Sequence, residues 1–205
     1  NNAYMMTGTH HLYNYLPTKH EKWLTMIKQE IIDSGLIIDI LNAKTMEAVF
    51  RLLQGCSFLG SFLAYQYTID MNYSPYINFS ENDFVKAGIG AIRGIKKCFL
   101  CYGNKCEDAI WYVKEHFNDL LKRYGYTSFH PLPGHEPTLI DLQNCFCETD
   151  KYLRAKMPEL RIGNVRIKQK YMPHTDPIQF FFPPKWNIVE MYKYKPIVVP
   201  TLFDL

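Results

Sequence analysis

The sequence predicts a mainly α-helical domain followed by an irregular, partly β C-terminal arm. The chain has 205 residues, of which 47% are hydrophobic, and this suits one well-buried domain. Apolar residues recur at helical spacing in several windows up to residue 157, and glycines separate these windows. Beyond that point the period gives way to short basic, aromatic and proline-rich stretches. We therefore place a helical domain at 1–157 and a basic, aromatic arm at 158–205.

The first windows predict helices in the order helix, hairpin, helix. Apolar residues recur at helical spacing over 20–41, where Gly35 is a candidate stop. A second amphipathic helix is expected over 45–55. A short connection closes at Gly60, and a third helix is expected over 61–73.

The following windows predict three more helices. Ser80 can cap a helix whose first turn carries Glu81 and Asp83 and which continues through VKAGIGAIRGIKKCF. Two amphipathic helices are expected over 109–124 and 138–154, and the segment HPLPGHEP between them reads as a loop.

Bulk composition restricts the environment and the partners. No stretch reaches the roughly 18 apolar residues of a membrane span, and the N-terminus lacks a secretory signal, so an intracellular protein is expected, in nucleus or cytoplasm. A net charge of +3 favours an anionic partner only slightly, so any nucleic-acid footprint must be local. The best basic stripes contain Lys96 and Lys97, then Arg161, Arg166, Lys168 and Lys170.

Glycine turns before helices have a physical use in DNA binding. Such a turn presents unpaired backbone N–H groups to a phosphate at the positive end of the helix dipole. Glycine allows the close approach, although many glycines at helix ends are ordinary C-caps. A carboxylate such as Asp83 can stabilise the oxocarbenium-like state as a base leaves, or it can simply favour the start of a helix.

Three segments carry a resemblance to a known family. FLGSFLAYQYTIDMNY, SENDFVKAGIGAIRGIKKCF and CETDKYLR resemble successive signature segments of the alpha-glutamyl/putrescinyl thymine pyrophosphorylase family. That family is also described as the helical domain of a 5-hydroxymethyluracil DNA kinase and is assigned to the DNA-glycosylase superfamily. The resemblance implies a helix-hairpin-helix, DNA-glycosylase-like fold that flips a modified pyrimidine out of DNA, with no metal or other cofactor.

The resemblance also implies site residues. Asp83 is the expected catalytic carboxylate for cleavage of the N-glycosidic bond, with Asp70 second. The residues expected to bind DNA or the base are Gly60, Tyr65, Gln66, Gly88, Gly90, Arg93, Gly94, Lys96, Lys97, Glu148, Asp150, Lys151 and Tyr152.

Two alternatives remain open at this point. Where the family usually has Gly-Pro-Gly, this chain has Gly88-Ile89-Gly90, which loosens the φ that proline would set. The N-terminal helical half of the family is also not recognised in this sequence. It is expected to lie upstream, to come from a second chain, or to have been lost together with catalysis. The protein would then be a DNA-binding or assembly subunit on the same scaffold. Alternatively, a zinc module could be formed by Cys98, Cys101, Cys106, Cys145 and Cys147, with His130 and His135. Free thiols are the simpler interpretation of these cysteines.

Overall fold

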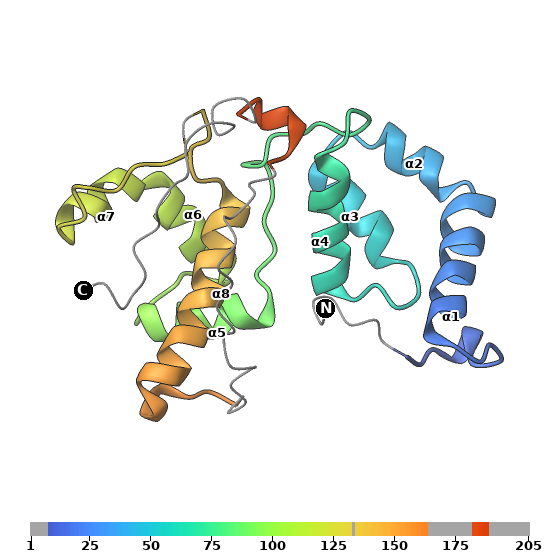
Figure 1. Cartoon of the computed structure of the whole chain (residues 1–205), viewed down its shortest axis with the longest axis horizontal. Coiled ribbons are helices and arrows are strands. Elements are labelled where there is room, and N and C mark those ends of the chain that lie inside the picture. The colour runs from blue at the N-terminus through green and yellow to red at the C-terminus, as the bar shows by residue number, and fades with distance from the viewer. Residues whose placement is uncertain (1–7, 133, 164–181, 189–205) are drawn as a thin grey trace, which may run out of the picture.

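The computed structural model describes residues 8–132, 134–163 and 182–188, and its regular elements are helices (Figure 1). Within these ranges the one β pairing is an isolated antiparallel bridge between Leu132 and His135. The mainly α prediction is therefore confirmed. No helix in the described ranges is long and apolar enough to cross a membrane. The α-helices are α1 (Lys19–Met26), α2 (Leu36–Asn42), α3 (Met46–Gln54), α4 (Ser61–Asn72), α5 (Ile89–Cys98), α6 (Glu107–Glu115), α7 (Phe117–Arg123) and α8 (Leu139–Lys156).

The predicted stop at Gly35 separates two helices. Thr18 and Glu21 form a capping box at the start of α1, because the Thr18 hydroxyl accepts the Glu21 N–H at 3.2 Å and the Glu21 carboxylate accepts the Thr18 N–H at 3.0 Å. A π-helical stretch, Ile27–Asp33, continues α1. Gly35 then adopts a left-handed φ of 82°, which a side chain would strain, and α2 follows at once.

Helices α3 and α4 pack side by side and hold much of the core of their half (Figure 1). Thr45 caps α3 by accepting the Ala48 N–H at 3.1 Å. Phe50 of α3 meets Tyr65 of α4 edge to face, with ring centroids 6.5 Å apart, and both are at most 1% exposed. The predicted order of helix, connection and helix is confirmed. That this pair is a DNA-binding helix-hairpin-helix motif stays a prediction.

The prediction that a helix begins at Ser80 is wrong. Ser80 closes a turn instead, because its hydroxyl accepts the Asn82 N–H at 3.1 Å and its carbonyl accepts the Asp83 N–H at 3.2 Å. The next residues alternate between two sides, as side chains do along an extended chain. Val85 and Ala87 are buried, and Lys86 between them donates to Glu107. A period of two replaces the helical period, and α5 begins only at Ile89.

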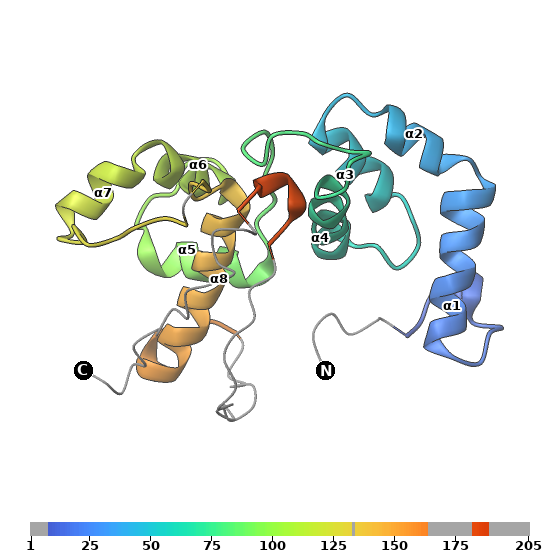
Figure 2. The same cartoon turned by 45° about the horizontal axis from the view of Figure 1, so that its top comes forward.

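The second half is built on the pair α5 and α8, which form the most extensive contact between helices in the described part of the chain (Figure 2). The single helix expected over 109–124 is instead two helices, α6 and α7, because His116 leaves the helical region at φ −108°, ψ 18°. Helix α6 packs against α8. Helix α7 contributes no buried residue.

Part of the predicted arm returns to the helical body. The short 3-10 turn Pro184–Trp186 lies between the two halves (Figure 2). The Lys185 ammonium donates to the carbonyls of Asn72 and Phe79 at 3.0 and 3.1 Å, and the Trp186 indole donates to Glu81 at 2.7 Å. The partly β character of the arm and the basic residues Arg166, Lys168 and Lys170 fall outside the described residues.

Candidate nucleic-acid interface

Two helix N-termini meet at one place. Gly60 precedes α4 and Gly88 precedes α5, and in the described residues neither helix has a side-chain cap or an acidic residue in its first turn. The Phe62 ring lies against Gly88, so that a β-carbon at position 88 would come within 3.2 Å of the ring and of Gln143 Oε1. Gly88 donates its own N–H to Gln143 Oε1 at 3.2 Å. The positive ends of two helix dipoles are therefore adjacent and uncompensated.

A buried ionic cluster joins the middle and last turn of α5 to α8. The Asp150 carboxylate of α8 contacts Lys97 Nζ at 2.7 Å, Arg93 Nε at 3.3 Å and Arg154 Nε at 3.2 Å. Asp150 and Lys97 are almost fully buried, whereas the Arg93 side chain is 21% exposed. Three cations therefore face this one carboxylate.

The electrostatics of this cluster favour the ionised carboxylate. Burial opposes ionisation of Asp150, but the hydrogen bonds from Lys97 and Arg93 outweigh burial and hold the pKa of Asp150 below its ordinary value. The sequence-predicted residues Arg93 and Lys97 thus meet Asp150 in space, although 57 and 53 positions separate them from it along the chain.

Gly90 and Gly94 face α8 across the same helix pair. A β-carbon on Gly94 would come within 2.8 Å of the Phe146 carbonyl carbon, and one on Gly90 would collide with the Cys147 thiol. These glycines let α5 approach the backbone of α8 closely. Helix packing therefore accounts for them, and their predicted contact with DNA stays a prediction.

The remaining predicted cations lie on the outside of the cluster. Lys96 is exposed in the last turn of α5, and Lys151 forms an exposed ion pair with Glu148 one turn away on α8. Tyr152 is 55% exposed, so its ring is open to a stacking partner. Arg161 donates to the backbone carbonyl of Arg154 at 3.2 Å, which holds its guanidinium close to the cluster.

The two predicted catalytic carboxylates lie away from the glycine turns. Asp70 is near the end of α4, ten residues from Gly60 and hence on the order of 15 Å along the helix axis. Asp83 is exposed in the turn after Ser80, at the far end of the extended stretch that leads to Gly88. Burial raises the pKa of Asp70 above its ordinary value.

Other residues of the first predicted segment divide between core and surface. Tyr65 is 1% exposed and belongs to the core, whereas Gln66 is half-buried. The carboxylates, the glycines and the cations therefore do not form one site.

The cysteines remain separate thiols. All six are free, and among the described residues no three His, Cys, Asp or Glu side chains are placed to hold a metal ion. Burial raises the pKa of five of these thiols, which disfavours the thiolate form that binds zinc: Cys56, Cys98, Cys106, Cys145 and Cys147. The described residues therefore give the zinc-module alternative no ligand cluster.

Two residues of the interface escaped the sequence reasoning. Arg154 completes the cluster, and its position four residues after Asp150 on a helix could have revealed it. Gln143 is 3% exposed and holds the Gly88 N–H, but no sequence signal links residues 55 positions apart.

Fold and site together define a domain whose described elements are helices, with two uncapped helix N-termini and a buried cluster of three cations around one carboxylate, an arrangement suited to anionic groups. The family model described as 5-hmdU DNA kinase, helical domain, matches residues 1–162, and the chain belongs to this family. The family is one of helical domains related to DNA modification, and the resemblance drawn from the three segments is confirmed. No curated protein and no solved structure matches the chain.

Proposed function

We propose that this domain binds DNA that carries a modified thymine and holds it for base-directed chemistry. The substrate class, 5-hydroxymethyl-deoxyuridine in DNA, is suggested by the description of the family as the helical domain of a 5-hmdU DNA kinase. The observation that carries the proposal is the cluster of Arg93, Lys97 and Arg154 around Asp150, along the middle and last turn of α5. Cations bind phosphate without reading sequence, and the uncapped N-terminus of α5 offers backbone N–H groups of the same use at its other end.

In this proposal the buried and the exposed cations have different roles. Lys97 and Arg154 are largely occupied by Asp150 and orient the α5–α8 pair. Lys96, Lys151 and the partly exposed Arg93 are available to phosphates. Part of the positive charge is thus fixed before DNA arrives, which lowers the ordering cost of binding.

The test is the salt dependence of DNA binding. A variant that neutralises one phosphate fewer than wild type should show a slope of log association constant against log salt concentration that is smaller by about 0.9. We therefore expect Lys96→Gln to weaken binding of a fluorescent duplex carrying 5-hydroxymethyluracil and to lower that slope by about one unit. The measurement is fluorescence anisotropy across a salt series.

A lysine in the other half of the chain provides the matched control. Lys28 has a side chain that is 69% exposed and forms an ion pair with Asp33 on the π-helical stretch. Lys28→Gln removes the same charge and should leave the slope unchanged. Equal slopes for Lys96→Gln and wild type would contradict the proposed surface.

Glycosidic-bond cleavage is the second candidate function. It is favoured by the raised pKa of Asp70, which extends the pH range over which this carboxyl can act as a proton donor. Its test is release of 5-hydroxymethyluracil from duplex DNA, assayed as abasic sites, with Asp70→Asn and Asp83→Asn compared with wild type. Release that either variant abolishes, with DNA binding kept, supports the enzyme. If wild type releases no base, glycosidic-bond cleavage is refuted and DNA binding is the remaining function.

Completion of the site by a further segment or chain is part of the binding proposal. The domain at 1–157 is then a DNA-holding unit, and an upstream segment or second chain supplies what the reaction needs. Adding such a partner should increase turnover of bound DNA and should leave the effect of Lys96→Gln in place.

A further inference from the structure

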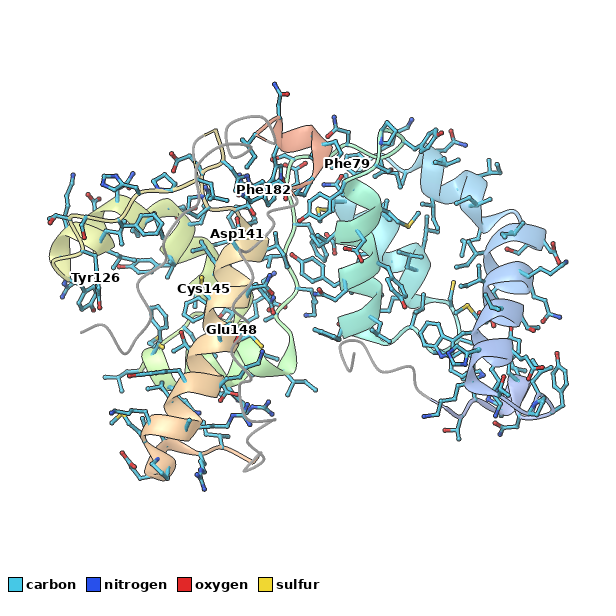
Figure 3. All side chains as sticks on the ribbon, in the orientation of Figure 1. Phe79, Tyr126, Asp141, Cys145, Glu148 and Phe182 are labelled. Atoms are coloured by element: carbon cyan, nitrogen blue, oxygen red, sulfur yellow. The ribbon has the colours of Figure 1, made fainter. Side chains whose placement is uncertain are left out.

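A groove of about 750 Å³ lies on the side of α8 that faces α7. Its lining is mainly apolar and includes several aromatic rings: Phe117 of α7, Tyr126 and Phe129 of the chain that follows α7, and Trp186, with His135 and with Asp141 of α8. We call this space the aromatic groove. Figure 3 labels Asp141 and Cys145 along α8, and Tyr126 beside α7. Its size is within the range of small-ligand sites, roughly 300–1,000 Å³.

One wall of the aromatic groove is held rigidly. The rings of His135 and Trp186 stack with centroids 3.6 Å apart and an angle of 23° between their planes. The Trp186 indole N–H is fixed by the Glu81 carboxylate at 2.7 Å, and Tyr73 packs edge-on against the indole at 5.9 Å. This wall is therefore in place before any ligand binds.

Two further rings of the lining are exposed. Phe129 packs edge to face on Phe117 with centroids 5.4 Å apart, and it remains 44% exposed. Tyr126 is 65% exposed. Exposed aromatic rings beside an apolar groove are the surface on which planar heterocycles stack.

One carboxylate, that of Asp141, is among the lining residues of the aromatic groove. Asp141 Oδ2 accepts from the Thr138 N–H at 2.8 Å and the Thr138 hydroxyl at 2.9 Å, and it contacts His135 Nε2 at 3.1 Å. All hydrogen bonds that the described residues make to Asp141 end on Oδ2, and its side chain is 35% exposed. The second oxygen, Oδ1, is left as an acceptor.

We propose that the aromatic groove holds a 5-substituted uracil base that has been extruded from DNA. Uracil and thymine carry an imide N3–H, which can donate to Asp141 Oδ1, whereas N3 of cytosine is an acceptor and would meet the carboxylate unfavourably. The base stacks on Tyr126 and Phe129. This inference rests on the proposed DNA-binding function for the delivery of the base, but not for recognition in the groove.

The experiment titrates the full chain with the free nucleosides 5-hydroxymethyl-2'-deoxyuridine and 2'-deoxycytidine, followed by ligand-observed NMR. These probes carry no phosphate, so failure of the cationic surface would not affect the result. Wild type should bind the uracil nucleoside in preference to the cytosine nucleoside. Equal binding of both, or binding of neither at millimolar concentration, would overturn the proposal.

Two variants localise the binding. Loss of one stacking ring in Tyr126→Ala should weaken binding roughly fivefold to a hundredfold. Tyr124→Ala is the matched control, because Tyr124 is 68% exposed nearby but lines neighbouring cavities and not this groove. Asp141→Asn gains an N–H donor and should reverse the base preference toward cytosine. Unchanged binding of the uracil nucleoside by Tyr126→Ala would refute the proposal that the base binds in the aromatic groove.

A duplex carrying 5-hydroxymethyluracil identifies the source of the base. It should displace the free nucleoside from wild type, whereas the matched duplex with cytosine at that position should not. A modified duplex that binds the protein and leaves the nucleoside in place would show that the groove does not take bases from DNA, and this would overturn the proposal.

Discussion

Removing the charge of Asp150 should destabilise the protein strongly. Asp150→Asn keeps the size of the side chain but leaves Arg93, Lys97 and Arg154 close together without their counter-ion. The Asp150 and Lys97 side chains are only 1% and 2% exposed, so water cannot replace the lost carboxylate. Removing one partner of a buried ion pair costs about 3–5 kcal/mol, a large part of a typical folding free energy of roughly 5–15 kcal/mol.

Urea unfolding followed by circular dichroism measures this cost. With a slope of about 2–3 kcal/mol per molar urea, the expected loss lowers the midpoint by roughly 1–2.5 M. Glu148→Gln is the control on the same helix, since its ion pair with Lys151 is exposed and should contribute less than about 1 kcal/mol. Lys97→Met leaves two cations on Asp150 and should cost less than Asp150→Asn.

The pH dependence of stability gives an independent readout. Because the folded-state pKa of Asp150 lies below its unfolded value, its contribution is complete above that unfolded value, about 3.9, and is lost as the pH falls through the folded pKa. Wild type should therefore lose stability below about pH 4, and Asp150→Asn should lose less over the same range. A variant that is less than about 1 kcal/mol destabilised at neutral pH, with an acid profile like wild type, would refute the reasoning.

Three further substitutions test local features by thermal or urea unfolding. Ile89→Pro should stabilise the protein by about 0.4–1 kcal/mol, because Ile89 is exposed at the first position of α5 and Gly88 before it is extended at ψ 166°; a loss would contradict this. Gly94→Ala should destabilise by about 1–3 kcal/mol despite the better helix propensity of alanine, because the methyl group meets the Phe146 backbone; a gain in stability would show that α5 can move away. Thr45→Ala should cost about 0.5–2 kcal/mol through the lost N-cap of α3, and no change would mean that water replaces the cap.

The helical part of the fold was largely predictable from the sequence. Local signals decide where α3 and α8 begin, since Thr45 and Thr138 precede apolar residues at helical spacing and bond within the next turn. Gly35 likewise interrupts the first helical region because a positive φ is a local property. Family membership also followed from three segments of sequence.

Local signals failed where contacts distant in sequence decide the conformation. The stretch after Ser80 has helix-compatible residues, but burial of Val85 and Ala87 and the pull of Glu107 on Lys86 make it extended. This moves Asp83 away from the helix on which the sequence had placed it. The break between α6 and α7 at His116 also has no local signal that we can name.

The candidate sites were decided by tertiary structure. The sequence contains Arg93, Lys97 and Asp150, but it cannot say that one carboxylate meets both cations across 53 or more residues. Trp186 comes from the end of the chain to bond Glu81, 105 residues away, and so builds a wall of the aromatic groove. Residue type and helical periodicity are local quantities, whereas ion pairs and cavities depend on which surfaces the folded chain brings together.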